Sequence, residues 1–147
     1  MSLFSFFKEA GEKIFGASDN NTDRGKKVTA HVRSYNIPGA TDIQVDCNED
    51  GVATVTGECE SPQVKQMVLT ATGNIEGVKE VNDKLKVRSS GKEADFYAVQ
   101  KGDTLSKIAE KYYNDASKYT IIFEANKPML TDPDKIYPGQ TLIIPKA

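Results

Sequence analysis

The last third of the chain constrains the fold most strongly, because recognisable turn motifs stand at both of its ends. It opens at 96–105 with an apolar stretch and the motif GDTL, and it closes at 136–145 with the motif YPGQ and a second apolar stretch. Two runs of apolar residues at helical spacing lie between these blocks. Thr104 is a suitable N-cap for the first run, and Lys127-Pro128 ends the second. The pattern predicts a unit of strand, helix, helix and strand.

These motifs, together with the phrase EAN at 124–126, resemble the LysM domain over Phe96 to Pro145. The resemblance implies recognition of N-acetylglucosamine polymers such as peptidoglycan, between two loops at one end of the unit. The candidate glycan-binding residues are Gly102, Asp103, Thr104, Asn126, Met129 and Leu130. The first three have a second interpretation, because the same residue types build turns and cap helices.

The middle of the chain alternates between helical and strand patterns. The expected elements are a helix over 24–35, strands over 42–47 and 51–57, a helix from Pro62 to Gly73 and a strand over 78–87. Ser61-Pro62 begins the second helix as N-cap and first helical residue. This order, with the turn sequences DG at 50–51 and GNIEGV at 73–78, resembles the BON domain over roughly Asp23 to Arg88.

The N-terminal segment Leu3 to Phe15 predicts a short amphipathic helix. Its apolar positions at approximately helical spacing are Phe4, Phe7, Gly11 and Ile14. Such a short helix is marginal in water on its own, so its aromatic face is expected to dock on the rest of the protein. The polar residues 16–23 predict a flexible connector.

Together these patterns predict an α+β protein of two small domains, an αββαβ BON-like domain with an N-terminal helix and a βααβ LysM domain. A chain of 147 residues is long enough for both. The expected limits are 1–22 for the N-terminal helix and connector, 23–88 for the BON domain, 89–95 for a linker and 96–147 for the LysM domain.

Composition excludes several classes of partner. The net charge is -2, so the chain lacks the basic surface that binding to nucleic acid or anionic lipid requires. The apolar N-terminus has no preceding basic region and no cleavage site typical of a secretory signal. No run approaches the roughly 18 apolar residues that span a bilayer. We expect a cytoplasmic monomer with no membrane contact.

The few residues suited to catalysis or metal binding are scattered. Cys47 and Cys59 lie too far apart along the expected hairpin for a disulfide, so two free thiols are predicted. His31 is the only histidine, and its spacing places it on the apolar face of its helix. Neither a zinc cluster, a catalytic triad nor a nucleotide-binding loop is indicated, so an enzyme is not expected.

The whole arrangement resembles the cytoplasmic bacterial potassium-binding protein family, including the runs FKEAGEK at 7–13 and FEANKPML at 123–130. The resemblance implies that the ligand is K⁺. It carries over six main-chain ligands, Phe7, Ala10, Gly11, Gly73, Ile75 and Val78. Potassium is large and weakly hydrated, so neutral carbonyl oxygens suit it, and such oxygens are available at helix ends and glycines. The other interpretation makes Gly11 a helix irregularity and Gly73 an ordinary C-cap.

The expected function is therefore K⁺ binding or sensing, with the domain arrangement stiffening when the ion binds. Two alternatives stay open on the sequence. One is an envelope protein that binds peptidoglycan through the LysM unit and a membrane or protein through the BON unit. The other is a structural adaptor in which both modules contact an unidentified protein partner.

Overall fold

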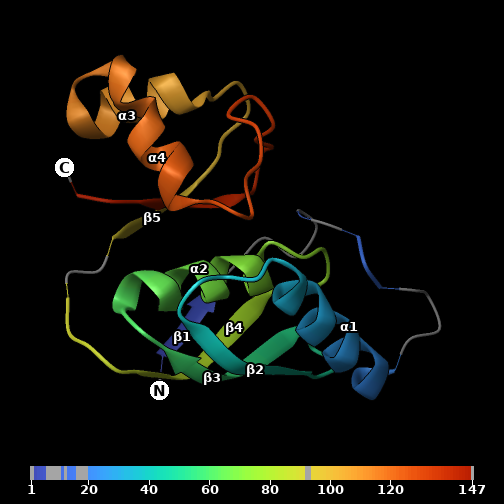
Figure 1. The fold of residues 1–147 in the computed structure, drawn as a ribbon. Coiled ribbons are helices and arrows are strands. Elements are labelled where there is room, and N and C mark those ends of the chain that lie inside the picture. The colour runs from blue at the N-terminus through green and yellow to red at the C-terminus, as the bar shows by residue number, and fades with distance from the viewer. Residues whose placement is uncertain (1, 6–10, 12, 16–19, 92–93, 147) are drawn as a thin grey trace.

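The computed structural model describes residues 2–5, 11, 13–15, 20–91 and 94–146, and it has an α+β fold of two domains (Figure 1). The N-terminal domain is built on four strands, β1 (Ser2–Ser5), β2 (Ala40–Cys47), β3 (Val52–Cys59) and β4 (Glu80–Val87). Their order in the sheet is β1-β4-β3-β2. The central pair β3 and β4 is parallel, and both outer pairs are antiparallel.

Helix α2 (Pro62–Gly73) connects the two parallel strands, as the sequence predicts. The Ser61 side chain accepts a hydrogen bond from the Val64 N–H at 3.3 Å, and Pro62 occupies the first turn. Figure 1 shows α2 lying between the sheet and the C-terminal domain. The buried core of the N-terminal domain consists of Val28, Val32, Ile37, Ile43, Val45, Ala53, Val55, Cys59, Val68, Leu69, Ala71, Ile75, Val78 and Val81.

Helix α1 (Asn21–Ser34) begins inside the segment predicted to be a connector. Asn20 caps it by accepting a hydrogen bond from the Asp23 N–H at 2.8 Å, and the Asp23 carboxylate accepts one from the Asn20 N–H at 3.3 Å. This reciprocal capping box starts the helix at Asn21, three residues before the start predicted at Arg24.

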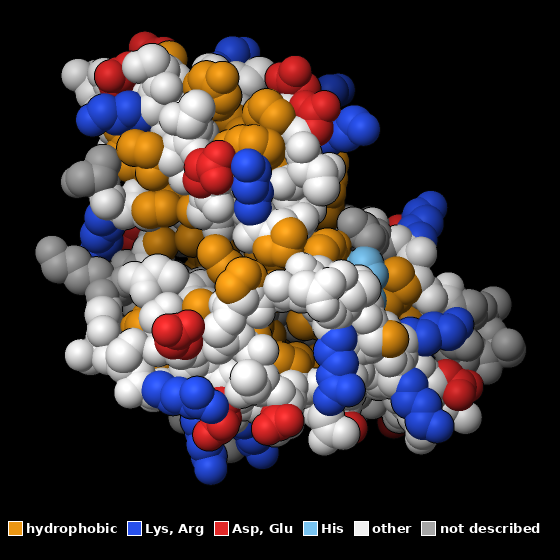
Figure 2. Space-filling view, viewed as in Figure 1, with side chains coloured by type: hydrophobic (Ala, Val, Ile, Leu, Met, Phe, Trp, Pro, Cys, Tyr) orange, Lys and Arg blue, Asp and Glu red, His pale blue; other side chains and the backbone are white. Residues whose placement is uncertain are grey.

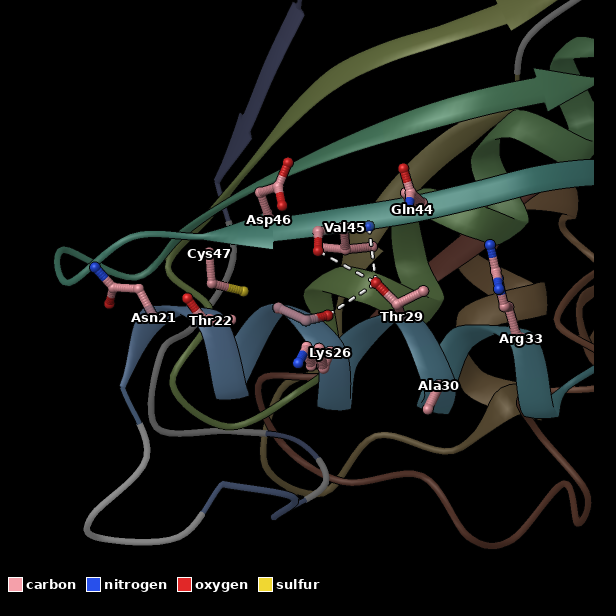
Figure 3. Close-up of a pocket in the computed structure, with 11 residues that line it drawn as sticks. Asn21, Thr22, Lys26, Thr29, Ala30, Arg33, Gln44, Val45, Asp46 and Cys47 are labelled. Carbon is pink, nitrogen blue, oxygen red and sulfur yellow. Dashed lines mark hydrogen bonds between the residues drawn. The ribbon is translucent and has the colours of Figure 1, made fainter.

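The same helix covers the open edge of strand β2 (Figure 3). The Thr29 hydroxyl accepts a hydrogen bond from the Val45 N–H at 2.9 Å, and the Arg33 Nε donates one to the Ile43 carbonyl at 2.8 Å. Gly25 permits this approach, since a Cβ there would lie 3.0 Å from the Val45 carbonyl oxygen. The open groove of about 610 Å³ beside this contact lies along the junction of α1 and β2, where α1 side chains already bond the Val45 N–H and the Ile43 carbonyl.

The predicted N-terminal helix is wrong over its first residues. Ser2–Ser5 form strand β1, which pairs antiparallel with β4, with Leu3 opposite Asn82. The rest of that predicted helix is a bend at Gly11 and irregular chain at 13–15, and its other residues lie outside the described part. A short isolated helix is marginal, whereas the unpaired edge of β4 offers backbone hydrogen bonds to any extended segment that reaches it.

The hairpin forms as predicted. Val45 lies opposite Val55, and a bulge between Thr41 and Gln44 interrupts the regular pairing. Cys47 lies opposite Ala53, whereas Cys59 lies opposite Ala40 at the other end of the hairpin. Cys47 and Cys59 are free thiols, so that prediction is confirmed.

The C-terminal domain has the predicted order of elements. They are β5 (Asp95–Ala98), α3 (Leu105–Tyr113), the short 3-10 helix η1 (Ala116–Lys118), α4 (Tyr119–Ala125) and β6 (Thr141–Ile144). Strands β5 and β6 pair antiparallel. A separate buried core of Val99, Leu105, Ile108, Ala109, Ile122, Leu130, Leu142 and Ile144 holds the domain together. Among the described residues no helix is long and apolar enough to cross a membrane.

Candidate functional site

The N-terminal segment meets the turn that follows α2 through the backbone of Gly11. A Cβ built on Gly11 would lie 2.6 Å from the Asn74 carbonyl carbon and 2.9 Å from the Ile75 nitrogen. The φ angle of Gly11 is +114°, which other residues rarely adopt. Only glycine allows the two backbones to lie this close, so Gly11 is matched to the turn.

The turn itself, residues 73–78, is held at both ends. At its start the Asn74 N–H donates to the Thr70 carbonyl at 2.9 Å, which closes the last turn of α2. Within it the Val78 N–H donates to the Ile75 carbonyl at 3.0 Å. The side chains of Ile75 and Val78 are buried in the core, so the backbone between them has little freedom. The result is a short, rigid loop at the C-terminal end of a helix.

The hairpin loop between β2 and β3 supports this turn from another direction. The Gly51 carbonyl accepts hydrogen bonds from the N–H groups of Lys79, at 2.8 Å, and Glu80, at 3.3 Å. A Cβ on Gly51 would lie 2.8 Å from the Gly77 carbonyl oxygen, and Gly51 has a φ of +83°. Gly11, Gly51 and Gly77, which belong to three separate segments, thus allow their main chains to lie close together at this turn.

Asn74 also ties this turn to the C-terminal domain. Its side-chain nitrogen donates to the Thr141 carbonyl at 2.8 Å, and its side-chain oxygen accepts from the Thr141 N–H at 2.9 Å. The amide therefore pairs with the edge of β6 as a neighbouring strand would. The contact is 67 residues apart in sequence, and it joins the candidate site to the other domain.

A second amide on α2 makes the same kind of contact with the chain that enters the C-terminal domain. The Gln66 side chain, only 2% exposed, donates to the Ala94 carbonyl at 2.7 Å and accepts from the Ala94 N–H at 3.0 Å. Gln66 and Asn74 lie two helical turns apart, so the two ends of α2 bind the linker and the C-terminal domain, respectively.

The domain junction is partly apolar and contains a partly open pocket of about 190 Å³. Its walls come from the ends of α1 and α2 and from the loop between α4 and β6, including Tyr35, Asn74, Met129 and Tyr137. Met129 packs against the core of the N-terminal domain. Figure 2 shows hydrophobic side chains gathered where the two domains meet. The loop that carries Met129 and Leu130 is thus part of the domain interface.

The remaining candidate glycan residues have structural partners. Thr104 accepts a hydrogen bond from the Lys107 N–H at 3.1 Å and so caps α3. Asp103 accepts from the Tyr97 hydroxyl at 2.5 Å and from the Gln100 N–H at 2.8 Å, and these bonds hold the pKa of its carboxyl below the usual range. Gly102 supplies a turn with φ of +87°. These positions build the loop, as the second interpretation of the sequence expected.

Asn126 is committed to the core of its domain. It is 3% exposed, its side-chain nitrogen donates to the Ile122 and Ile143 carbonyls, and its side-chain oxygen accepts from the Ile143 N–H at 2.8 Å. Asn126 therefore forms hydrogen bonds with the backbone of Ile143 in β6, two residues from Thr141, with which Asn74 pairs.

Replacing Asn126 by leucine, which has a similar volume, is expected to destabilise the C-terminal domain. The Ile143 N–H and carbonyl would lose their buried partners, at roughly 1–3 kcal/mol each in the free energy of unfolding. Urea unfolding measures the loss. Asn21→Leu, at an exposed asparagine, is the control and should change that free energy by under about 0.5 kcal/mol. Equal stability of both variants would contradict the assigned role.

The proposed ion ligands are only partly within the described residues. Gly11, Gly73, Ile75 and Val78 come together at the turn, whereas Phe7 and Ala10 lie outside the described part. The roles of Asn74, Gln66 and Gly51 were missed from the sequence. An asparagine directly after the last glycine of a helix was the available signal, but it reads equally well as an ordinary helix end.

Two domain families match the chain. Residues 20–89 match the BON domain and residues 97–145 match the LysM domain. The potassium binding protein Kbp of Escherichia coli O6:H1 (strain CFT073) is 46% identical over 149 residues, which cover 99% of this chain and 99% of that protein.

Two further relatives share shorter stretches. An uncharacterized protein of Deinococcus radiodurans is 51% identical over 49 residues, which cover 33% of this chain and 19% of that protein. The uncharacterized protein YqbP of Bacillus subtilis (strain 168) is 35% identical over 78 residues, 47% of this chain and 36% of that protein. Neither stretch approaches the length of the match to Kbp.

Proposed function

This chain belongs to the family of the potassium binding protein Kbp, and we propose that it binds K⁺ where the N-terminal segment meets the turn after α2. One observation carries the proposal. The backbone of Gly11 lies against that of Asn74 and Ile75, in a conformation and at a distance that only glycine allows. Because this packing brings main chain from two distant segments together, carbonyl oxygens from both can surround one ion.

The electrostatics of the turn favour a cation. The C-terminal end of a helix carries a partial negative charge, equivalent to roughly half an elementary charge, from its unpaired carbonyls. The last turn of α2 contains no basic side chain that would neutralise it. Neutral carbonyls of this kind match the weak hydration of K⁺, whereas Ca²⁺ and Mg²⁺ usually take carboxylates or keep water.

The proposed ligands are the main-chain carbonyls of Phe7, Ala10, Gly11, Gly73, Ile75 and Val78. The Ile75 carbonyl already accepts one hydrogen bond, from the Val78 N–H, and its second lone pair can serve the ion. The matched domains and the name of the nearly full-length relative are those of binding proteins, which favours a binding role over catalysis.

We further propose that the ion stiffens the arrangement of the two domains. Asn74 supports this, because its main chain contacts Gly11 while its side chain pairs with Thr141 of the C-terminal domain. An ion that orders the turn would also order this amide. The proposal places the protein in the cytoplasm, where K⁺ is abundant, and cell fractionation tests that location.

Calorimetric titration with KCl, and with NaCl as control, tests the binding. We expect a saturable heat for KCl only. A ligand that binds only the folded state stabilises it by RT ln(1 + [L]/Kd), which is about 2.7 kcal/mol at a hundredfold excess over Kd. The melting temperature should therefore rise with KCl beyond its value in NaCl of equal ionic strength. Identical heats and melting curves in the two salts would exclude the proposal.

A further inference from the structure

A single aromatic ring connects the N-terminal segment to the far side of the same turn. A Cβ built on Gly77 would lie 3.0 Å from Cδ2 and 3.1 Å from Cε2 of Phe15, and Gly77 has a φ of +102°. The ring therefore packs directly on the bare backbone of Gly77. Phe15 is half-buried and joins the edge of the N-terminal core. This contact and that of Gly11 hold the same segment to opposite ends of the turn.

The guanidinium of Arg24, in the first half of α1, packs on the ring of Phe15. Its central carbon lies 5.4 Å from the ring centroid, within the range of a cation–π contact. The Arg24 Nε is buried and has no hydrogen-bond partner within the described part of the chain. The ring of Phe15 thus gives this half-buried cation a favourable contact next to its unpartnered Nε.

The other neighbours of this guanidinium do not replace the ring. Cys47 lines the same narrow gap as Phe15, Arg24, Gly77 and Val78. Burial raises the pKa of the Cys47 thiol to about 11, so at neutral pH it is an uncharged thiol and not an anionic partner. The Phe15 ring is therefore held between a fixed helix on one side and the backbone of the turn on the other.

A second tie between these two segments is weaker. The Lys13 ammonium and the Glu76 carboxylate are 4.0 Å apart, with 81% and 38% of their side chains exposed. Exposed ion pairs of this kind contribute little to stability. Of the two ties, the packed ring of Phe15 is the stronger, and the neighbouring Ile14 also packs against the N-terminal core.

From this arrangement we propose that Phe15 is a positioning residue for the ion site. Packed between Gly77 and Arg24, the ring holds the segment that carries Gly11 against the turn. The carbonyl groups of the segment and those of the turn can then face the same ion. The proposal rests on the proposed function and deepens it. Phe15 lies four residues beyond Gly11, a distance of about 14 Å at most, so anchoring the ring restricts where Gly11 can lie.

The test compares variants of the full chain by titration with KCl and by melting in NaCl. Phe15→Ala is expected to lower the K⁺ affinity by about tenfold or more, while Phe15→Tyr, which keeps the ring, stays within about threefold of the parent protein. Arg24→Gln removes the cation but leaves the ring, and should lower the affinity by about threefold. This third variant changes a half-buried side chain near the surface and is expected to fold.

Phe123→Ala is the matched control. Phe123 is also half-buried and also carries a cation, with the Lys127 ammonium 4.7 Å from its ring centroid, but it belongs to the C-terminal domain. Its loss should leave the K⁺ affinity within about twofold of the parent. The melting temperature in NaCl reports on packing alone, which allows a general loss of stability to be separated from a specific loss of binding.

Two results would contradict the proposed positioning role of Phe15. One is K⁺ affinity of Phe15→Ala within twofold of the parent protein. The other is an equal loss of K⁺ affinity in Phe15→Ala and Phe15→Tyr, because tyrosine keeps the aromatic ring and should therefore keep its positioning role. Failure of the proposed function itself looks different, since the parent protein would then give no heat with KCl.

Discussion

Gly11→Ala is expected to abolish K⁺ binding at concentrations where the parent protein is saturated. The added methyl group would lie 2.6 Å from the Asn74 carbonyl carbon and 2.9 Å from the Ile75 nitrogen. Both are backbone atoms, which cannot rotate away as a side chain could. An alanine at a φ of +114° also costs about 1–2 kcal/mol in backbone conformational energy. The N-terminal segment must then move off the turn, and we expect the affinity to fall by about a hundredfold or more. Calorimetric titration with KCl measures this.

Substitutions at two other glycines serve as controls that distinguish the steric clash from the backbone strain. Gly102→Ala introduces the same conformational strain, at a φ of +87°, but with no atom within 4 Å of the new Cβ. Gly91→Ala introduces neither the strain nor a close contact, since its nearest neighbour is 3.5 Å away. Both controls should keep the K⁺ affinity of the parent. Retention of full affinity by Gly11→Ala would show that the two backbones need not touch for the ion to bind.

Asn74→Ala is expected to uncouple the two domains and to weaken K⁺ binding by about tenfold. The substitution removes both hydrogen bonds to Thr141, at 2.8 and 2.9 Å, and leaves the N–H and carbonyl of that residue without their amide partner. If the ion and the domain contact stabilise one conformation of the turn, each must strengthen the other by the same factor. Titration gives the affinity, and NMR relaxation gives the rotational correlation time of each domain.

Gln66→Ala provides the comparison for Asn74→Ala. It removes an equivalent pair of hydrogen bonds, to Ala94, at the end of α2 that is remote from the turn. We expect it to loosen the linker while the K⁺ affinity stays within about twofold of the parent. Similar affinity losses in both variants would mean that domain docking in general supports the site. Unchanged affinity and unchanged domain motion in Asn74→Ala would remove the proposed link.

Local sequence signals were sufficient for most of the fold. Ser61-Pro62 and Thr104 begin helices because a side-chain oxygen and a fixed φ act within a few residues, without help from the rest of the chain. The same holds for the order of elements in the C-terminal domain. In contrast, Ser2–Ser5 form a strand only because β4 has an open edge, and no local pattern reports partners such as Asp83, which pairs with Ser2 from the far end of the domain's sequence.

The candidate site divides in the same way. The glycines at 11, 73 and 77 can be noticed in the sequence as places where the backbone has unusual freedom, and the family resemblance selects some of them as ligands. Their neighbours cannot be read from the sequence. That Gly11 faces Asn74, that Phe15 covers Gly77 and that Asn74 reaches Thr141 are consequences of packing between segments far apart in the chain.

By itself, the sequence determined two domains, the order of their elements from α1 onward and the family to which the chain belongs, because caps, turns and apolar spacing are local properties. The tertiary structure decided what those elements do to one another. It added the N-terminal strand to the sheet, turned the Met129 loop toward the other domain and placed Asn74 between the turn and β6. Such contacts depend on the relative position of whole elements, which burial and backbone pairing settle only when the chain is folded.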